Sequence, residues 1–276
     1  MIKYLRDKYY WYRVNTKIES YFKNKYENKI LIYGFPKSGN TWVRFLIYNY
    51  LNLLNNINVT KTISFDKLNE LQNNVMDRGT TFYNKKGYPI IYRTHKIFVK
   101  PYLLFDKRIF IHRNPLDTLI SSYYFYKNRE IPFSGDDKKY RDLLFDINFY
   151  VRYKLEDWIN FYTQSVKYAH LNINYSDIIS NPHRILLKIV EFLDLEVNKK
   201  FIDKSVEFSK INNIRVMSLN ENQQYGNGPK DGSFHGEFIR DGKESQFYQE
   251  LESKTIDFVI SNFPDFNQIY PNLIEK

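Results

Sequence analysis

Short apolar segments alternate with longer amphipathic segments along this chain. Four short segments predict strands: Lys29–Tyr33, Pro89–Arg93, Arg108–His112 and Leu171–Tyr175. Apolar residues at helical spacing predict helices at about 41–54, 142–168 and 246–262, and after the pairs Asn114-Pro115 and Asn181-Pro182. Strands that alternate with helices favour an α/β fold with a central, mainly parallel sheet flanked by helices.

Two helix starts are well marked. Asn114 is a good N-cap, Pro115 suits the first helical position, and Asp117 places a negative charge in the first turn. Asn181 and the proline after it repeat this signature. The glycine-containing stretch 220–242 predicts a loop. No repeat or low-complexity linker divides the 276 residues, so we expect a single domain.

The composition excludes several kinds of site. The chain has no cysteine, which excludes a disulfide scaffold, a thiol nucleophile, a thiolate zinc site and an iron–sulfur cluster. A net charge of +10 favours an anionic partner, but the basic residues are spread along the chain. The first eight residues are charged where a secretory signal would be apolar, and no apolar run approaches the ~18 residues of a membrane span. We therefore expect a cytoplasmic protein without membrane insertion.

The loop GFPKSGNT, residues 34–41, lies between the first predicted strand and the first long predicted helix. Glycines at such a position let backbone N–H groups point at an anion beside a helix N-terminus. The spacing from Gly34 to Gly39 and Thr41 nearly matches the phosphate-binding pattern GxxxxGK[ST], but Asn40 holds the usual lysine position and Lys37 lies inside the loop. The pattern favours a non-standard nucleotide site over a simple tight turn.

A kinase-type site also needs Mg²⁺, held by a loop hydroxyl and an acidic residue at a strand end. The strand 108–112 is followed instead by Arg113. Residues 103–106 (LLFD) imitate an acidic strand end, but they follow Pro101 and stand just before a stronger strand, which predicts a short helix. The missing acid counts against phosphoryl transfer and favours metal-free chemistry.

Further candidates stand where the other predicted strands end, because functional groups of open α/β sheets gather at the carboxyl ends of strands. These are Arg93 with His95, Arg113, and Tyr175. A guanidinium at position 113 and the Ser121 hydroxyl two helical turns later suit a dianionic phosphate, while a salt bridge that caps the helix is the alternative. The remaining histidines lack such a setting and are expected to be structural: His112, His170, His183 and His235.

These motifs together resemble the soluble, cytosolic-type sulfotransferases that use 3′-phosphoadenosine 5′-phosphosulfate (PAPS). FPKSGNTW at 35–42 resembles the family's PKSGTTW, RTH at 93–95 its KTH, RNPLDTLISSY at 113–123 its RNPKDxxxSxY, NYSD at 174–177 its YED, and RDGK at 240–243 its RKG. The motifs occur in the family's order between about Lys29 and Phe263. The resemblance implies a P-loop-like fold.

The resemblance also implies roles for individual residues. The 5′-phosphosulfate would be held by Lys37, Ser38, Gly39, Asn40, Thr41 and Trp42. The 3′-phosphate would be held by Arg113 and Ser121, helped by Arg240 and Gly242. Tyr175 and Phe208 would contact the adenine. His95 would be the general base, Lys37 would stabilise the bridging oxygen as it leaves, and Arg93 is the third candidate catalytic residue. Adenosine 3′,5′-bisphosphate (PAP) would be the product, and no metal is expected.

Several positions depart from the family's pattern. Asp241 replaces a lysine beside the 3′-phosphate, Phe247 replaces a tryptophan, and Arg93 replaces a lysine. Lys96 stands where an apolar residue is common. The acceptor pocket is expected to draw on residues 63–88 and 126–140, with Phe65, Phe82, Tyr83 and Phe133 as candidate lining.

The sequence leaves the acceptor open between a small molecule and a glycan, and it leaves the oligomeric state open. Two other function classes compete with sulfuryl transfer. A P-loop kinase would depend on Mg²⁺ and bind ATP, and the displaced loop lysine opposes it. A nucleic-acid-binding protein would show steeply salt-dependent binding, and the absence of a clustered basic segment opposes it.

Overall fold

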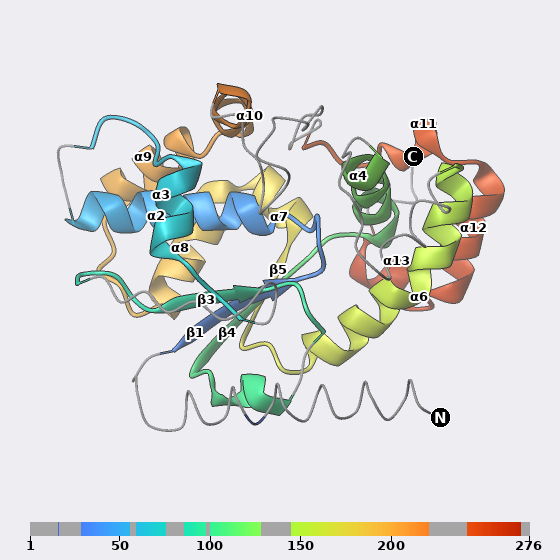
Figure 1. Cartoon of the computed structure of the whole chain (residues 1–276), viewed down its shortest axis with the longest axis horizontal. Coiled ribbons are helices and arrows are strands. Elements are labelled where there is room, and N and C mark those ends of the chain that lie inside the picture. Colours follow the sequence, from blue (N-terminus) through green and yellow to red (C-terminus); the bar gives the residue numbers. More distant parts are fainter. Residues whose placement is uncertain are drawn as a thin grey trace.

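The computed structural model describes residues 29–55, 59–75, 86–97, 100–127, 145–220 and 242–271, together with Thr16. Within these residues, five parallel strands form one sheet in the order β2-β3-β1-β4-β5 (Figure 1). The strands are β1 (Ile30–Gly34), β2 (Asn73–Asn74), β3 (Ile91–Thr94), β4 (Lys107–His112) and β5 (Leu171–Asn174). The expected parallel sheet is confirmed, and the two-residue edge strand β2 is added to the four predicted strands.

Helices cover both faces of this sheet. The α-helices are α2 (Asn40–Asn55), α3 (Phe65–Leu71), α4 (Pro115–Lys127), α6 (Ile147–Val166), α7 (Tyr175–Ser180), α8 (Pro182–Phe192), α9 (Lys199–Phe208), α10 (Ile211–Asn220), α11 (Phe247–Glu250), α12 (Ser253–Asn262) and α13 (Phe266–Ile269). The segment that imitated an acidic strand end begins in a 3₁₀ helix, Lys100–Leu104, as predicted. No helix in the described ranges is both long enough and apolar enough to cross a membrane.

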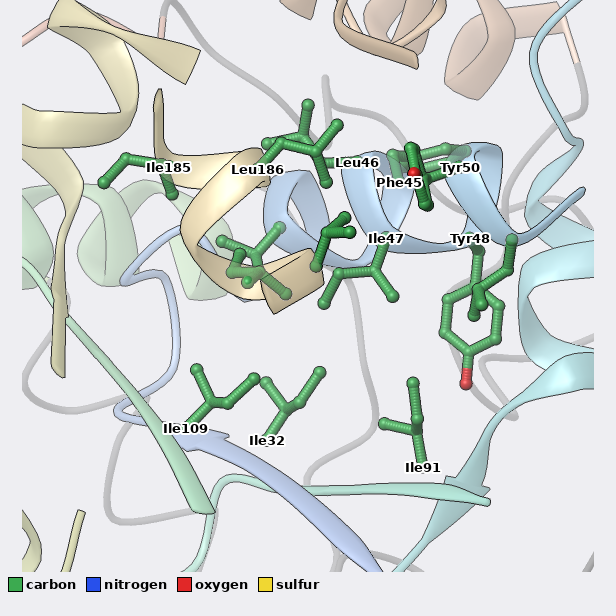
Figure 2. Packing of buried hydrophobic residues seen from close by; sticks show 14 of the residues in the cluster. Ile32, Phe45, Leu46, Ile47, Tyr48, Tyr50, Ile91, Ile109, Ile185 and Leu186 are labelled. Atoms are coloured by element: carbon green, nitrogen blue, oxygen red, sulfur yellow. The ribbon is translucent and has the colours of Figure 1, made fainter. Parts of the chain in front are cut away.

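The alternation of side chains along β1 divides the core into two layers. Ile30 and Ile32 face α2, α3, α8 and α9, whereas Leu31 and Tyr33 face α4, α6 and α12. Figure 2 shows the first layer, in which Ile32, Ile91 and Ile109 of the sheet lie below α2 and the start of α8. Because both faces of β1 are buried, this strand is a continuous apolar run.

Both predicted N-caps are confirmed. Asn114 Oδ1 accepts a hydrogen bond from Asp117 N at 2.8 Å, and Asn181 Oδ1 accepts one from Arg184 N at 2.9 Å. Each bond satisfies a backbone donor of the first helical turn that has no partner within the helix.

The structure corrects three predicted boundaries. The predicted helix 246–262 is two helices, α11 and α12, because Leu251 and Glu252 adopt extended backbone between them. The predicted helix 142–168 begins at Ile147 within the described residues, since Asp146 caps it by accepting from Phe149 N at 2.7 Å. Tyr175, predicted at the end of a strand, is the first residue of α7. Only the two ends of the predicted loop 220–242 are described.

Candidate functional site

The candidate residues lie at the carboxyl edge of the sheet. Parallel pairing aligns Tyr33 with Thr94, Gly34 with Ile111, and His112 with Asn174. The segments that follow β1, β3, β4 and β5 therefore leave the sheet at the same edge. These segments carry residues 34–41, which we call the lysine loop, and also His95, Arg113 and Tyr175. The sequence predicts that these groups follow the ends of parallel strands.

The lysine loop is a tight turn with a strained residue at its centre. Ser38 N donates to Phe35 O at 3.2 Å, so residues 35–38 close a turn, with Pro36 at the position that proline favours. Lys37 follows with φ of 72°, a conformation that this kind of turn usually assigns to glycine. Asn40 Nδ2 donates to the same Phe35 carbonyl at 3.1 Å and holds the turn against α2. Such strain is typical of functional sites.

The turn leads directly into the N-terminus of α2, a helix of 16 residues. Gly39 O accepts the first bond of this helix, from Val43 N at 3.2 Å, and no acidic residue stands in the first turn. The Ser38 hydroxyl is buried and has no hydrogen-bond partner among the described residues. The Lys37 ammonium lies 4.6 Å from the centroid of the Phe125 ring on α4. One turn at a helix N-terminus therefore carries backbone donors, a hydroxyl and an ammonium, all of which are groups that bind anions.

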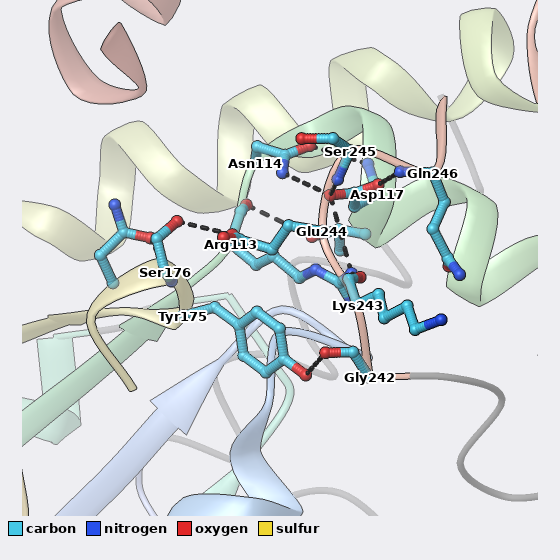
Figure 3. Close-up of polar contacts among 12 residues, drawn as sticks. Arg113, Asn114, Asp117, Tyr175, Ser176, Gly242, Lys243, Glu244, Ser245 and Gln246 are labelled. Carbon is cyan, nitrogen blue, oxygen red and sulfur yellow. Dashed lines mark hydrogen bonds and ion pairs between the residues drawn. The ribbon is translucent and has the colours of Figure 1, made fainter. Parts of the chain in front are cut away.

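Tyr175 is the centre of a second part of the site (Figure 3). The Arg113 guanidinium carbon lies 4.4 Å from the centroid of its ring, and the Trp42 ring lies edge-on at 5.9 Å. The Tyr175 hydroxyl donates to Gly242 O at 3.0 Å. Burial raises the pKa of Tyr175, while the nearby Arg113 charge lowers it. The ring thus connects the start of α2, the start of α4 and the segment at Gly242.

Arg113 is only 6% exposed, and its guanidinium has two kinds of partner. Its Nη2 donates to Lys243 O at 2.6 Å and lies 3.7 Å from Asp117 Oδ2 on the first turn of α4. The helix-capping ion pair that the sequence left as an alternative is therefore present. Arg113 Nε is buried without a hydrogen-bond partner among the described residues, so this donor is unsatisfied there.

A segment distant in sequence closes this part of the site. We call Gly242–Gln246 the strap. Asp117 accepts Ser245 N at 2.9 Å and Gln246 N at 3.1 Å, and it also accepts Asn114 Nδ2 at 2.8 Å. Ser176 Oγ donates to Glu244 Oε1 at 2.5 Å (Figure 3). From the sequence, Asp117 is expected only to interact with the dipole of α4, and its role in holding the strap is missed. Local residue spacing carries no signal for a partner 128 positions away.

His95 lies immediately after β3 and is half-buried. Its Nδ1 is 2.9 Å from Gly34 O. A carbonyl oxygen only accepts, so Nδ1 carries the proton in this bond, and Nε2 is the nitrogen that carries the lone pair of a neutral ring. Arg93, two residues earlier, is near Tyr48 of α2: burial raises the pKa of Tyr48, and the charges of Arg44 and Arg93 lower it.

Other predicted site residues that the structure describes lie near this edge of the sheet without a side-chain hydrogen bond or ring contact to Lys37, Arg113 or Tyr175. Ser121 is half-buried on α4, and Thr41 is half-buried in the first turn of α2. Phe208 ends α9, next to Ser209, whose carbonyl accepts Trp42 Nε1 at 2.8 Å. The predicted residues Arg240, Asp241, Phe82, Tyr83 and Phe133 lie outside the described residues.

Two positions singled out in the sequence are core residues. Phe65 is fully buried and packs edge-on against Phe45, with ring centroids 4.9 Å apart. It therefore supports α3 against α2, which corrects its proposed place in the lining of the acceptor pocket. Phe247 is 1% exposed and belongs to the core layer below α4 and α6. Lys96 is exposed, which fits a solvated side chain.

His112 is structural, as expected for a histidine inside a strand. Its ring stacks on Phe110 with centroids 5.6 Å apart, and its Nδ1 is 3.0 Å from the Tyr270 hydroxyl. Burial lowers the pKa of His112 to about 4.

Within the described part of the chain, no group of three or more His, Asp or Glu side chains is arranged to hold a metal ion.

Comparison with known proteins gives a consistent family signal. The family model described as "Sulfotransferase domain" matches residues 27–263. The chain is 25% identical over 261 residues to sulfotransferase 1 family member D1 of Mus musculus, covering 89% of this chain and 83% of that protein. It is 23% identical over 260 residues to the 3-beta-hydroxysteroid sulfotransferase of Cavia porcellus, covering 92% of this chain and 86% of that protein.

Solved structures share the fold. A mouse sulfotransferase complexed with PAP superimposes with a TM-score of 0.61 at 16% identity, covering 94% of this chain and 89% of that one. A retinol dehydratase in complex with androsterone and the inactive cofactor PAP gives a TM-score of 0.60 at 12% identity, covering 93% and 86% of the two chains. These likenesses establish the predicted α/β sulfotransferase architecture.

Proposed function

The chain belongs to the sulfotransferase family, and from this premise we propose that it transfers a sulfuryl group from PAPS to a hydroxyl group of a small-molecule or glycan acceptor. One observation carries the proposal. At a single edge of the sheet, a strained lysine turn on a helix N-terminus lies beside a buried arginine stacked on Tyr175. The first group suits a phosphosulfate, and the second suits an adenine nucleotide with a further phosphate.

The chain's own atoms fit such a donor. The buried Ser38 hydroxyl and Arg113 Nε have no hydrogen-bond partner among the described residues, and both are groups that a bound anion satisfies. In the proposal, Lys37, Ser38, Gly39, Asn40, Thr41 and Trp42 bind the 5′-phosphosulfate. Arg113 and Ser121, with Arg240 and Gly242, bind the 3′-phosphate, while Tyr175 and Phe208 contact the adenine. PAP, named in the titles of the structural relatives above, is the corresponding product.

PAPS supplies an activated sulfuryl group, and the chain's residues prepare its transfer. His95 Nε2 takes the proton of the acceptor hydroxyl, since Nδ1 is engaged with Gly34 O. The new bond joins the acceptor oxygen to sulfur, and the bond from sulfur to the bridging phosphate oxygen breaks. Lys37 neutralises the charge that develops on that bridging oxygen, and Arg93 adds positive charge on the His95 side. We propose that this reaction needs no metal ion.

The proposal is tested with the purified full chain, labelled PAPS and a library of hydroxylated acceptors, with products detected by mass. We expect transfer of label to at least one acceptor, undiminished by EDTA. We also expect PAP to raise the melting temperature more than ATP does. Loss of transfer on chelation would contradict a metal-free reaction, and stabilisation by ATP with Mg²⁺ but not by PAP would indicate the kinase alternative. Binding to nucleic acid that falls steeply with salt would indicate the other alternative.

A further inference from the structure

Glu244 is an acidic residue of the strap to which the proposed reaction gives no role. Its carboxyl accepts a 2.5 Å hydrogen bond from Ser176 Oγ on α7. The preceding residue, Lys243, offers its carbonyl to Arg113 Nη2 at 2.6 Å. Figure 3 shows Glu244 beside Arg113, at the point where the strap crosses the start of α4. A carboxyl therefore lies next to the guanidinium that is proposed to bind the 3′-phosphate.

Among the described residues, the charged groups around Glu244 come from several elements. Arg113 is the described cation that faces it, and the Lys243 side chain on its own segment is exposed. The titratable groups from the neighbouring helices are Asp117 of α4, Tyr175 and Asp177 of α7, and Tyr270 after α13. Burial, Asp117 and Asp177 raise the pKa of Glu244, although Ser176 and Arg113 oppose them.

The charge of Arg113 is already shared before any ligand binds. Asp117 lies 3.7 Å from its Nη2, so a charged Glu244 would be a second carboxylate beside one guanidinium. A dianionic phosphate brought to Arg113 would meet the repulsion of a charged Glu244 in a partly buried place, where charges are poorly screened. A neutral Glu244 removes this repulsion and keeps its hydrogen bond to Ser176.

We propose that Glu244 limits the affinity of the site for a 3′-phosphorylated nucleotide, because its carboxylate, when charged, opposes the phosphate beside Arg113. This inference rests on the proposed function, because it takes a nucleotide of the PAP type as the ligand. Binding of the dianion then draws a proton onto Glu244. A charged Glu244 therefore lowers PAP affinity, and this penalty grows as the pH rises through the pKa of the carboxyl.

The Glu244 carboxyl lies close to the position of the glutamate in the family's YED segment, but it comes from a different segment of the chain. Where the family's YED segment has glutamate, this chain has Ser176, and the carboxyl that bonds to Ser176 comes from the strap instead. The acid thus arrives on the segment that also carries Gly242, whose carbonyl accepts the Tyr175 hydroxyl. Its charge is placed to act on the nucleotide and not only on α7.

The test compares the full-length wild-type chain with Glu244→Gln by calorimetric titration of PAP and of adenosine 5′-monophosphate from pH 5.5 to 8.5. We expect the variant to bind PAP more tightly, by about tenfold at the highest pH, the size of one close charge repulsion, with a gain that does not shrink as the pH rises. The monophosphate has no 3′-phosphate, so its affinity stays equal in the two proteins throughout. Comparing the proteins at each pH removes the titration of the ligand's own phosphate, whose second pKa is about 6.

Glu252→Gln is the matched control. It removes the same charge from a half-exposed side chain at the start of α12. It leaves PAP affinity unchanged. Equal PAP affinity of wild type and Glu244→Gln at every pH, weaker binding by that variant, or the same gain in Glu252→Gln would each overturn the inference. If Glu244→Gln does not fold, Ser176→Ala replaces it. This variant loses the hydrogen bond that lowers the pKa of Glu244, so its PAP affinity falls at a higher pH than that of the wild type. An unshifted curve of PAP affinity against pH overturns the inference. If the wild-type chain binds the monophosphate but not PAP at any pH, the proposed function itself fails.

Discussion

The ring of Tyr175 lies so close to the backbone of Gly39 that a β-carbon at position 39 would be 2.5 Å from Tyr175 Cδ2. Gly39 also has φ of 98°, which L-residues with a side chain rarely adopt. The last residue before α2 therefore touches the aromatic ring that supports Arg113. This contact joins the proposed phosphosulfate subsite to the proposed 3′-phosphate subsite, so a shift in one displaces the other.

Gly39→Ala is expected to weaken PAP binding by at least tenfold and to lower stability by about 1–3 kcal/mol, since the new methyl group meets a buried ring in an unfavourable backbone conformation. PAP titration and thermal melting measure the two effects. Gly87→Ala is the control, because Gly87 also has positive φ, at 86°, and a methyl group there would meet the Asn55 side chain at the far end of α2. This control loses stability but keeps its PAP affinity. Equal affinities in the two variants would mean that Gly39 does not shape the nucleotide site.

Arg113→Ala is expected to lose about 2–5 kcal/mol of PAP binding, because a buried dianion is left without its charged partner. Binding of adenosine 5′-phosphosulfate, which has no 3′-phosphate, barely changes. The two ligands are needed because Arg113 also pairs with Asp117 and holds the strap through Lys243 O. Arg113→Lys separates these roles further, since it keeps a charge but loses the guanidinium fork. Equal losses for the two ligands would assign Arg113 to the fold alone.

Much of this architecture could be predicted from local sequence. Short segments rich in apolar residues mark β1, β3 and β4, apolar residues that alternate with asparagine mark β5, and the asparagine–proline pairs mark the starts of α4 and α8. Since parallel strands end at a common edge, four separate motifs could be placed in one site before any contact was known. The two asparagines of β2 have no apolar pattern, and they form a strand only because β3 offers an unpaired edge.

What could not be predicted depends on contacts between distant residues. Asp117 has the same sequence signature whether it serves only the dipole of α4 or also binds the strap, and 128 positions separate it from Ser245. Glu244 stands in a segment without periodicity, so its proximity to Ser176 follows only from the fold. The strained φ of Lys37 is likewise invisible in sequence, because a lysine usually avoids that conformation.

His112 is expected to make stability fall in acid. Its pKa is about 4 in the folded protein and about 6.5 in an unfolded chain, so below pH 6.5 the unfolded state binds a proton that the folded state does not. The free energy of unfolding therefore decreases as the pH is lowered from about 6.5 to about 4, by about 3 kcal/mol in all. His112→Gln removes this part of the decrease, as measured by urea unfolding at pH 7, 5.5 and 4. The control, His183→Gln, changes a half-exposed side chain and keeps the wild-type slope. Parallel curves for wild type and His112→Gln would contradict the prediction.

Replacing His95 and replacing Lys37 are expected to have different effects on kcat and on donor affinity. His95→Ala loses the positioned base, so kcat falls by about 10²–10⁴-fold, while PAP affinity and melting temperature stay close to wild type. Lys37 is best replaced by glycine, which adopts φ of 72° without strain, so that only the side chain is tested. Lys37→Gly is expected to lose both rate and donor affinity, because the ammonium is proposed to contact the donor, and to melt no lower than wild type. Steady-state kinetics on the identified acceptor, PAP titration and thermal melting make the comparison. Near-normal turnover by His95→Ala would place the base elsewhere, and unchanged donor affinity in Lys37→Gly would remove Lys37 from the donor site.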